Sequence, residues 1–135
     1  MGETGKVARE LGRDFINDNT VNPHLSPYID TLYQVESEMN ESFETVLHEA
    51  LKHFQQYDKK TIKAILDKMF EDGTYSWGSI AMVYIFVRKC AQQCREQGKV
   101  DKHTIEQLAQ FVGEYVEDRC TQWIEHRGGW VSILC

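Results

Sequence analysis

The sequence has few residues that break helices and no segment that would direct the chain into or across a membrane. Only two prolines occur among 135 residues, Pro23 and Pro27, and both lie in one stretch. Regular alternation of apolar and polar residues is also scarce, so helices are favoured over strands. No basic segment followed by an apolar run opens the chain, which argues against a signal peptide. The longest apolar run, residues 80–87, is too short to span a bilayer, so no stable membrane insertion is expected.

The sequence also has fewer positively charged than negatively charged residues. The chain has 15 Lys and Arg against 21 Asp and Glu, a net charge of −6. This balance argues against a nucleic-acid partner, because phosphate surfaces select for a basic face. Four cysteines without an export signal are typical of reduced thiols in the cytosol. At this length and with 41% hydrophobic residues, we expect a single domain, residues 1–135, with one core.

Apolar residues recur at three- and four-residue steps along most of the chain, which is the pattern of amphipathic helices. The stretch 20–27 is predicted to be a loop, and Pro27 with Ser26 before it could open the next helix, with the proline near its first turn. The segment 80–87 differs from the others because it is apolar all round, which indicates a helix surrounded by other helices. The predicted class is therefore all-α, a central hydrophobic helix wrapped by amphipathic ones. The predicted helices cover 6–16, 28–54 with a break near Ser42 or His48, 58 to Gly73, 76–97, 101–119, and a short segment from Thr121.

Several segments resemble the homology boxes of the B-cell-lymphoma-two (Bcl) family of apoptosis regulators, in the family's order. Residues 70–80, with Trp77-Gly78, resemble the first box, and 122–130, with Trp123 and Gly128-Gly129-Trp130, resemble the second. Residues 8–16 are similar to the family's N-terminal helix box, and 32–39 look like a degenerate third box. Taken singly, each tryptophan is equally well explained as a core aromatic. The joint order, over nearly the whole chain, carries the resemblance.

The resemblance implies a surface groove that receives an amphipathic helix, the BH-three ligand, from a pro-apoptotic partner. For Met82 and Phe86, packing in the core is an equally good explanation. Carried over residue by residue, the groove would be formed by Met39, Phe43, Val46, Ile65, Met69, Gly78, Ser79, Ala81, Met82 and Phe86.

Two positions of the first box depart from the family pattern. Ser79 stands where the family has an arginine that pairs with an aspartate of the ligand helix. Serine cannot supply that charged fork, so binding is expected to survive with narrower or altered ligand choice. Ser76 replaces the usual asparagine and is still expected to cap the helix that follows.

The resemblance also implies a role. A chain that stops soon after the second box without a membrane tail looks like the compact pro-survival proteins of large DNA viruses. Glu36 and Ser37 replace the small-residue/aspartate pair of an intact third box, which also favours a sequestering role. The expectation is an inhibitor of apoptosis in the cytoplasm, that of the host cell if viral, peripheral to mitochondria at most. The alternative is an interaction module outside apoptosis that dampens immune signalling.

Two further hypotheses concern assembly and chemistry. A homodimer that hides the groove until a ligand arrives is a hypothesis, because a large exposed apolar patch is unusual on a monomer. Cys90, Cys94 and His103 could approach one another, yet their spacing matches no closed zinc pattern. The five histidines are scattered and show no catalytic arrangement. We therefore expect no enzyme activity, no metal and no cofactor.

Overall fold

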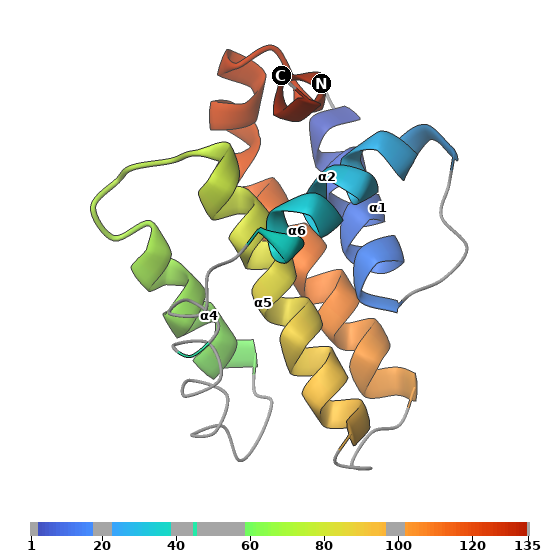
Figure 1. Ribbon diagram of the computed structural model, residues 1–135. Helices are drawn as coiled ribbons and strands as arrows, with labels where there is room; N and C mark the ends of the chain where they lie inside the picture. Colours follow the sequence, from blue (N-terminus) through green and yellow to red (C-terminus); the bar gives the residue numbers. More distant parts are fainter. Residues whose placement is uncertain (1–2, 18–22, 39–44, 46–58, 97–101, 135) are drawn as a thin grey trace.

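The computed structural model describes residues 3–17, 23–38, 45, 59–96 and 102–134, and these residues form helices joined by short turns (Figure 1). No strand occurs in this part of the chain, so the predicted all-α class is confirmed. The elements are α1 Glu3–Asn17, the 3-10 turn η1 Pro23–Leu25, α2 Ser26–Ser37, α4 Lys59–Met69, α5 Trp77–Glu96, α6 Lys102–His126 and the 3-10 turn η2 Trp130–Leu134.

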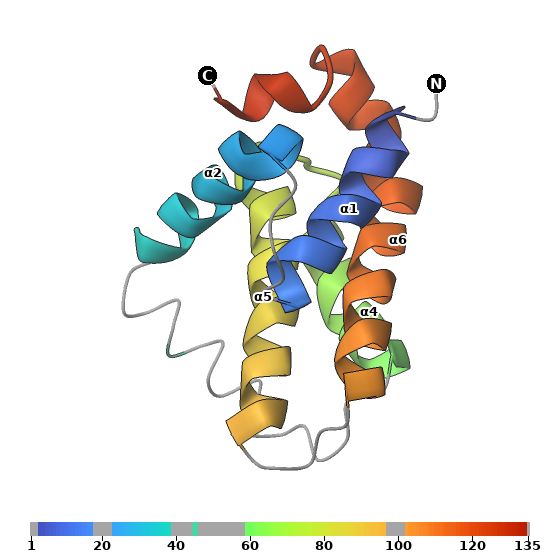
Figure 2. The ribbon, with the colours of Figure 1, turned by 90° about the vertical axis from the view of Figure 1, so that its right-hand side faces the viewer.

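Helix α5 runs through the middle of the molecule, with α1, α2, α4 and α6 arranged around it (Figures 1 and 2). Within the apolar run 80–87, every residue except the half-buried Met82 is at most 1% exposed. The prediction of a central helix enclosed by amphipathic neighbours is therefore confirmed. Burial of this run removes several large side chains from water, each contributing roughly 1.5–3 kcal/mol to folding.

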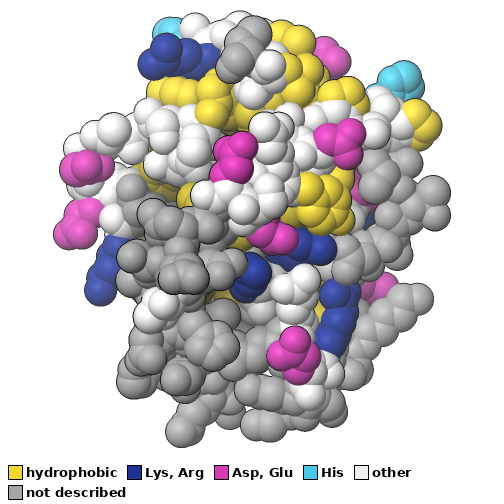
Figure 3. Space-filling model, in the orientation of Figure 1, with side chains coloured by type: hydrophobic (Ala, Val, Ile, Leu, Met, Phe, Trp, Pro, Cys, Tyr) yellow, Lys and Arg dark blue, Asp and Glu magenta, His cyan; other side chains and the backbone are white. Residues whose placement is uncertain are grey.

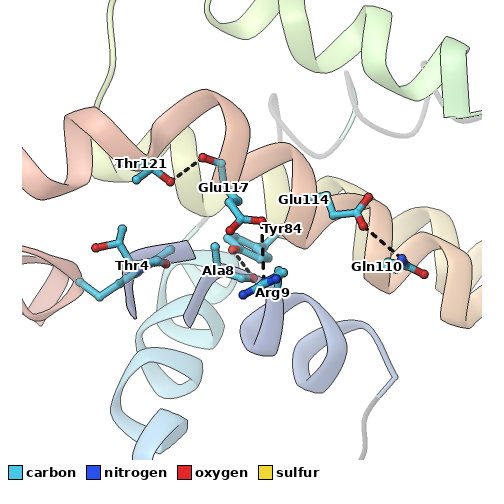
Figure 4. Close-up of polar contacts among 9 residues, drawn as sticks. Thr4, Ala8, Arg9, Tyr84, Gln110, Glu114, Glu117 and Thr121 are labelled. Carbon is cyan, nitrogen blue, oxygen red and sulfur yellow. Dashed lines mark hydrogen bonds and ion pairs between the residues drawn. The ribbon is translucent and has the colours of Figure 1, made fainter. Parts of the chain in front are cut away.

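Helices α1 and α6 lie side by side in both ribbon views and approach each other closely at two glycines (Figures 1 and 2). A Cβ atom on Gly113 would stand 2.6 Å from the Cα of Arg9, and one on Gly12 would stand 2.6 Å from the carbonyl oxygen of Ala109. Figure 4 shows two polar contacts of α1, one with α5 and one with α6. The buried Tyr84 hydroxyl donates to the Ala8 carbonyl at 2.8 Å, and Arg9 pairs with Glu117 at 3.7 Å.

The first turn of α1 and the 3-10 turn η2 lie at the same end of the bundle (Figures 1 and 2). There the indole N–H of Trp130 donates to the Thr4 carbonyl at 3.0 Å, joining η2 to the first turn of α1. Apolar side chains gather on this end in the space-filling view (Figure 3). Among them Val131 and Leu134 of η2 are 58% and 46% exposed. In the described part of the chain, no helix is both long and apolar enough to cross a membrane.

Two predicted helix boundaries are wrong. The helix predicted for 28–54 ends at Ser37, where the Glu38 amide closes the last turn on the carbonyl of Gln34 at 3.1 Å, whereas its opening at Ser26 and Pro27 is confirmed. The residues beyond it, including Ser42 and His48, lie outside the described residues except for Thr45. The separate helix predicted from Thr121 does not exist, because α6 continues to His126. The Thr121 hydroxyl donates to the Glu117 carbonyl one turn earlier, so threonine is accommodated within the helix.

Smaller differences concern the turns. The loop predicted for 20–27 contains η1, and Pro27 falls in the first turn of α2, where its missing N–H costs no helical hydrogen bond. Helix α4 ends at Met69, and Gly73, with φ of 76°, reverses the chain four residues later. Gly73 therefore closes the turn after the helix, and its amide donates to the Phe70 carbonyl at 2.9 Å.

Candidate functional site

The predicted groove residues that the structure describes lie around the N-terminal half of α5. Helices α2 and α4 flank this half of α5 on two sides (Figures 1 and 2). Ile65 of α4 and Met82 of α5 are half-buried and pack against the core. Met69 ends α4, and its side chain lies outside the described residues, as do Met39, Phe43 and Val46. The side of the groove assigned to Met39, Phe43 and Val46 therefore stays a prediction.

Two other predicted groove residues lie in the core. Ala81 and Phe86 are each 1% exposed and belong to the hydrophobic cluster around α5. The explanation of Phe86 as a core residue fits this placement, whereas Met82 keeps part of its surface accessible. A direct contact of Ala81 or Phe86 with a ligand stays a prediction.

Gly78 stands at the exposed start of α5 with free space around it. A Cβ atom placed on it would find the Ser76 hydroxyl at 3.7 Å as its nearest described neighbour, an ordinary van der Waals distance. Gly78 is also not among the three glycines with positive φ, so its backbone does not require glycine. Neither the conformation nor the packing of the described residues explains why this helical position lacks a side chain.

Ser76 and Ser79 form a polar pair at the start of α5. The Ser79 amide donates to the Ser76 hydroxyl at 3.1 Å, and the two hydroxyl oxygens are 3.0 Å apart. Because Ser76 also accepts the first helical bond from Ile80, the expected cap at this position is confirmed. The position where the family carries an arginine is thus neutral, and its hydroxyl already bonds within the chain.

The residues of the first and second homology boxes meet at one end of the bundle although about fifty positions separate them. The Trp77 ring lies 5.2 Å from that of Trp123 and 5.4 Å from that of Trp130. Gly128 and Gly129, with φ of 95° and 90°, end α6 in a left-handed turn, and the Gly129 amide donates to the Ile124 carbonyl at 2.9 Å. This turn carries Trp130 back onto Trp77.

An ion pair that the sequence did not single out joins α2 to α5. One guanidinium nitrogen of Arg88 lies 2.8 and 3.0 Å from the two carboxylate oxygens of Glu36. The guanidinium also lies 5.0 Å from the ring centre of Phe15 and 4.8 Å from that of Tyr33. The one available signal was that Arg88 is the first charged residue after the apolar run 80–87.

A second polar cluster joins α4 to α6. The Tyr115 hydroxyl donates to an oxygen of Asp67 at 2.7 Å, and Arg119 donates to the same oxygen at 3.2 Å. The hydrogen bond from Tyr115, with Lys63 and Arg119 nearby, lowers the pKa of the Asp67 carboxyl below its usual value. Burial raises the pKa of Tyr115 well above its usual value, and the bond to Asp67 adds to this effect.

Neither buried cysteine of the described residues is poised as a ligand or nucleophile. Cys90 and Cys120 are both fully buried. Burial raises the pKa of the Cys120 thiol to about 12, which keeps it neutral and unreactive. Within the part of the chain that the structure describes, no three His, Cys, Asp or Glu side chains are grouped so that they could hold a metal.

A central apolar helix sheathed by amphipathic ones, with two tryptophan-glycine boxes joined at one end, defines the helical bundle of apoptosis regulators. The family model described as "Apoptosis regulator proteins, Bcl-2 family" matches residues 32–130, so the chain belongs to the Bcl-2 family. Bcl-2-related protein A1 of Bos taurus is 27% identical over 107 residues, which is 73% of this chain and 59% of that protein. The chain thus spans about 59% of the length of this relative.

Two solved structures share the fold. Chicken BOK superposes with a TM-score of 0.77 at 18% identity, covering 97% of this chain and 94% of that one. The zebrafish pro-survival protein NRZ, solved in complex with Bad BH3, has a TM-score of 0.74 at 18% identity and covers 98% of this chain and 90% of that one. At this identity the two likenesses show the fold alone. The expected viral origin stays a prediction.

Proposed function

We propose that this protein inhibits apoptosis by binding the BH-three helix of a pro-apoptotic Bcl-2 relative in a groove beside the N-terminal half of α5. Membership of a family of apoptosis regulators supports the proposal, as does the likeness to a pro-survival protein solved with a BH3 partner. The expected cytoplasmic location and the sequestering mechanism belong to the same proposal.

The observation that carries the proposal is Gly78. In the middle of a helix glycine is less stable than alanine by roughly 0.5–1 kcal/mol, and by less in the first turn, where Gly78 lies; here alanine would fit without a clash with the described residues or a strained backbone. A residue that weakens its own helix without an internal reason is explained by contact with something outside it. Without a Cβ atom, the start of α5 lets a foreign backbone approach closely, as a helix lying across it would require.

The expected affinity follows from the apolar contacts of such a ligand. Anchors at i, i+3 or i+4, and i+7 would each contribute roughly 1.5–3 kcal/mol on leaving water. The cost of ordering the ligand reduces this sum, and four anchors still reach nanomolar binding. At Ser79 the neutral hydroxyl forms no ion pair with the ligand, so ligand choice rests on apolar fit more than on charge.

The test is a Gly78→Ala substitution measured by calorimetry against a panel of BH-three peptides. We expect at least tenfold weaker binding, because the new methyl group separates the two helices, together with an unchanged or slightly raised melting temperature. The control is Glu106→Ala at an exposed position of α6, which should leave both quantities unchanged.

Two results would count against the proposal, and they differ in meaning. Equal binding by the wild type and Gly78→Ala would place the ligand elsewhere on the molecule. Failure of the wild type to bind any peptide would reject BH-three sequestration and favour an interaction module outside apoptosis.

A further inference from the structure

Helix α2 is held unevenly against the rest of the bundle. Its first seven residues, 26–32, bury Ile29 and Leu32, which are 2% and 1% exposed. Its last five residues, 33–37, bury no side chain fully, since Val35 is half-buried and Tyr33 is 39% exposed. The hydrophobic effect therefore stabilises the packing of the start of α2 much more than that of its end.

The end of α2 is held by Arg88 of α5. The guanidinium binds both carboxylate oxygens of Glu36, at 2.8 and 3.0 Å, and lies beside the packed rings of Phe15 and Tyr33, whose centres are 5.3 Å apart. The Arg88 and Glu36 side chains are only 11% and 19% exposed, so water and salt screen the pair little. The contact with Arg88 also explains why an aromatic residue stands at position 33. The Tyr33 ring lies over the cation although much of its surface is exposed.

The stability of α2 as a helix does not explain why a glutamate stands at position 36. A carboxylate in the last turn of a helix faces the negative end of the helix dipole and destabilises the helix slightly. Glu36 occupies that turn, one residue before α2 ends at Ser37. A residue unfavourable to its own helix but paired at 2.8 Å with another helix serves the contact between the two helices.

We propose that Arg88 is a positioning residue of the ligand groove: it holds the C-terminal end of α2 on α5 and so fixes where one wall of the groove begins. The inference rests on the proposed function, because that wall is predicted to continue directly from the end of α2. When the pair is broken, the last turn of α2 detaches locally, while the core around α5, α1 and α6 stays folded.

Amide hydrogen exchange tests the attachment without any ligand. Glu36→Gln removes the charge but keeps the shape, and Arg88→Lys keeps the charge but loses the planar fork and its stacking. In both variants we expect the amides of residues 35–38 to exchange at least tenfold faster, with the amides of α5 unchanged. The matched control is Glu117→Gln, which breaks the more exposed pair between Arg9 and Glu117 on the α1–α6 face and should leave α2 unchanged.

A double variant assigns the effect to the pair itself. If Arg88 holds the end of α2 mainly through Glu36, Glu36→Gln combined with Arg88→Lys should accelerate exchange no more than the stronger single change. Tyr33→Leu removes one ring from the guanidinium and leaves the carboxylate, so it should give a smaller acceleration. Unchanged exchange at residues 35–38 in all the variants would overturn the inference.

Binding of BH-three peptides tests the link to the groove. We expect Glu36→Gln to weaken the tightest peptide of the panel about tenfold, mainly through faster dissociation, with Glu117→Gln unchanged. Faster exchange with undiminished affinity would overturn the positioning role, because the end of α2 would then not be a groove wall. If the wild type binds no peptide, the proposed function fails and the positioning role fails with it. The exchange data would then still decide whether Arg88 holds α2.

Discussion

Helical glycines of this chain differ in what surrounds them, and the difference separates packing from binding. Gly78 is exposed and has room for a side chain, whereas Gly113 lies against the backbone of α1. A Cβ atom on Gly113 would stand 2.6 Å from the Cα of Arg9 and 3.2 Å from the Ala8 carbonyl oxygen. Backbone atoms cannot move aside as a flexible side chain can, so α1 and α6 would have to separate.

Gly113→Ala is therefore expected to destabilise the fold by about 1–3 kcal/mol, the usual range for an added methyl group in a tight interface. Urea unfolding measures the effect, with Gly78→Ala as the matched substitution that costs nothing. Equal stability of the two alanine variants would show that α1 and α6 can separate at no cost.

Ser79 leaves the start of α5 without the positive charge of the family's arginine. Replacing it with arginine gives the start of α5 a cation with a planar fork, the group that the family pattern places there. We expect Ser79→Arg to tighten or broaden peptide binding, by a charge-assisted bond contributing on the order of 1.5–3 kcal/mol if shielded and less than 1 if exposed. Calorimetry on the same peptide panel measures this, and no change for any peptide would mean that residue 79 does not face the ligand.

Among the elements, α4 is attached to α6 through polar groups. Asp67 accepts bonds from Tyr115 and Arg119, and its side chain keeps 32% of its surface exposed. Its pKa is lowered in the folded protein, chiefly by the Tyr115 hydroxyl. A carboxyl whose folded pKa lies below its unfolded value stabilises the fold above the unfolded value and loses this contribution as pH falls through the folded value.

Acidification should therefore reveal the contribution of Asp67. We expect Asp67→Asn to be less stable than the wild type by about 1 kcal/mol at pH 7, a modest figure because the site is partly exposed. The difference should shrink as pH falls below about 4, where the unfolded carboxyl takes up its proton. Urea midpoints from pH 7 to 3 measure it. A difference that stays constant over this range would mean that the charge of Asp67 contributes nothing.

At the scale of the helices, the apolar pattern of the sequence predicted much of the burial, whereas the polar contacts between helices could not be predicted from it. Burial of residues 80–87 follows from their composition, because a helix without a polar face must be surrounded. The pair between Arg88 and Glu36 joins positions 52 residues apart, and no local rule links two such charges. The end of α2 was missed for a related reason, since the apolar spacing continues past Ser37 and carries no signal for a stop.

At the scale of the whole molecule, Trp130 near the C-terminal end contacts helices from the N-terminal part and the middle of the chain. Its side chain is 4% exposed, bonds to the Thr4 carbonyl, and lies 5.4 Å from the ring of Trp77. The two tryptophan boxes were found in the sequence by their order, and the contact between their rings was not predicted. The bond to α1 was not predictable, because a backbone carbonyl carries no sequence signature.

All three tryptophans of the chain belong to this one cluster, so their fluorescence reports on a single end of the bundle, whereas far-UV circular dichroism reports on every helix. Because Trp130 ties this end to α1, we expect both signals to change together in one urea transition, as for a two-state domain of this size. Trp130→Ala should destabilise the fold by about 3–5 kcal/mol, as usual for a large buried aromatic, and both transitions should move together. A fluorescence transition at lower urea than the dichroism transition would show that the tryptophan end melts on its own. Trp130 would then stabilise only that end and not the rest of the bundle.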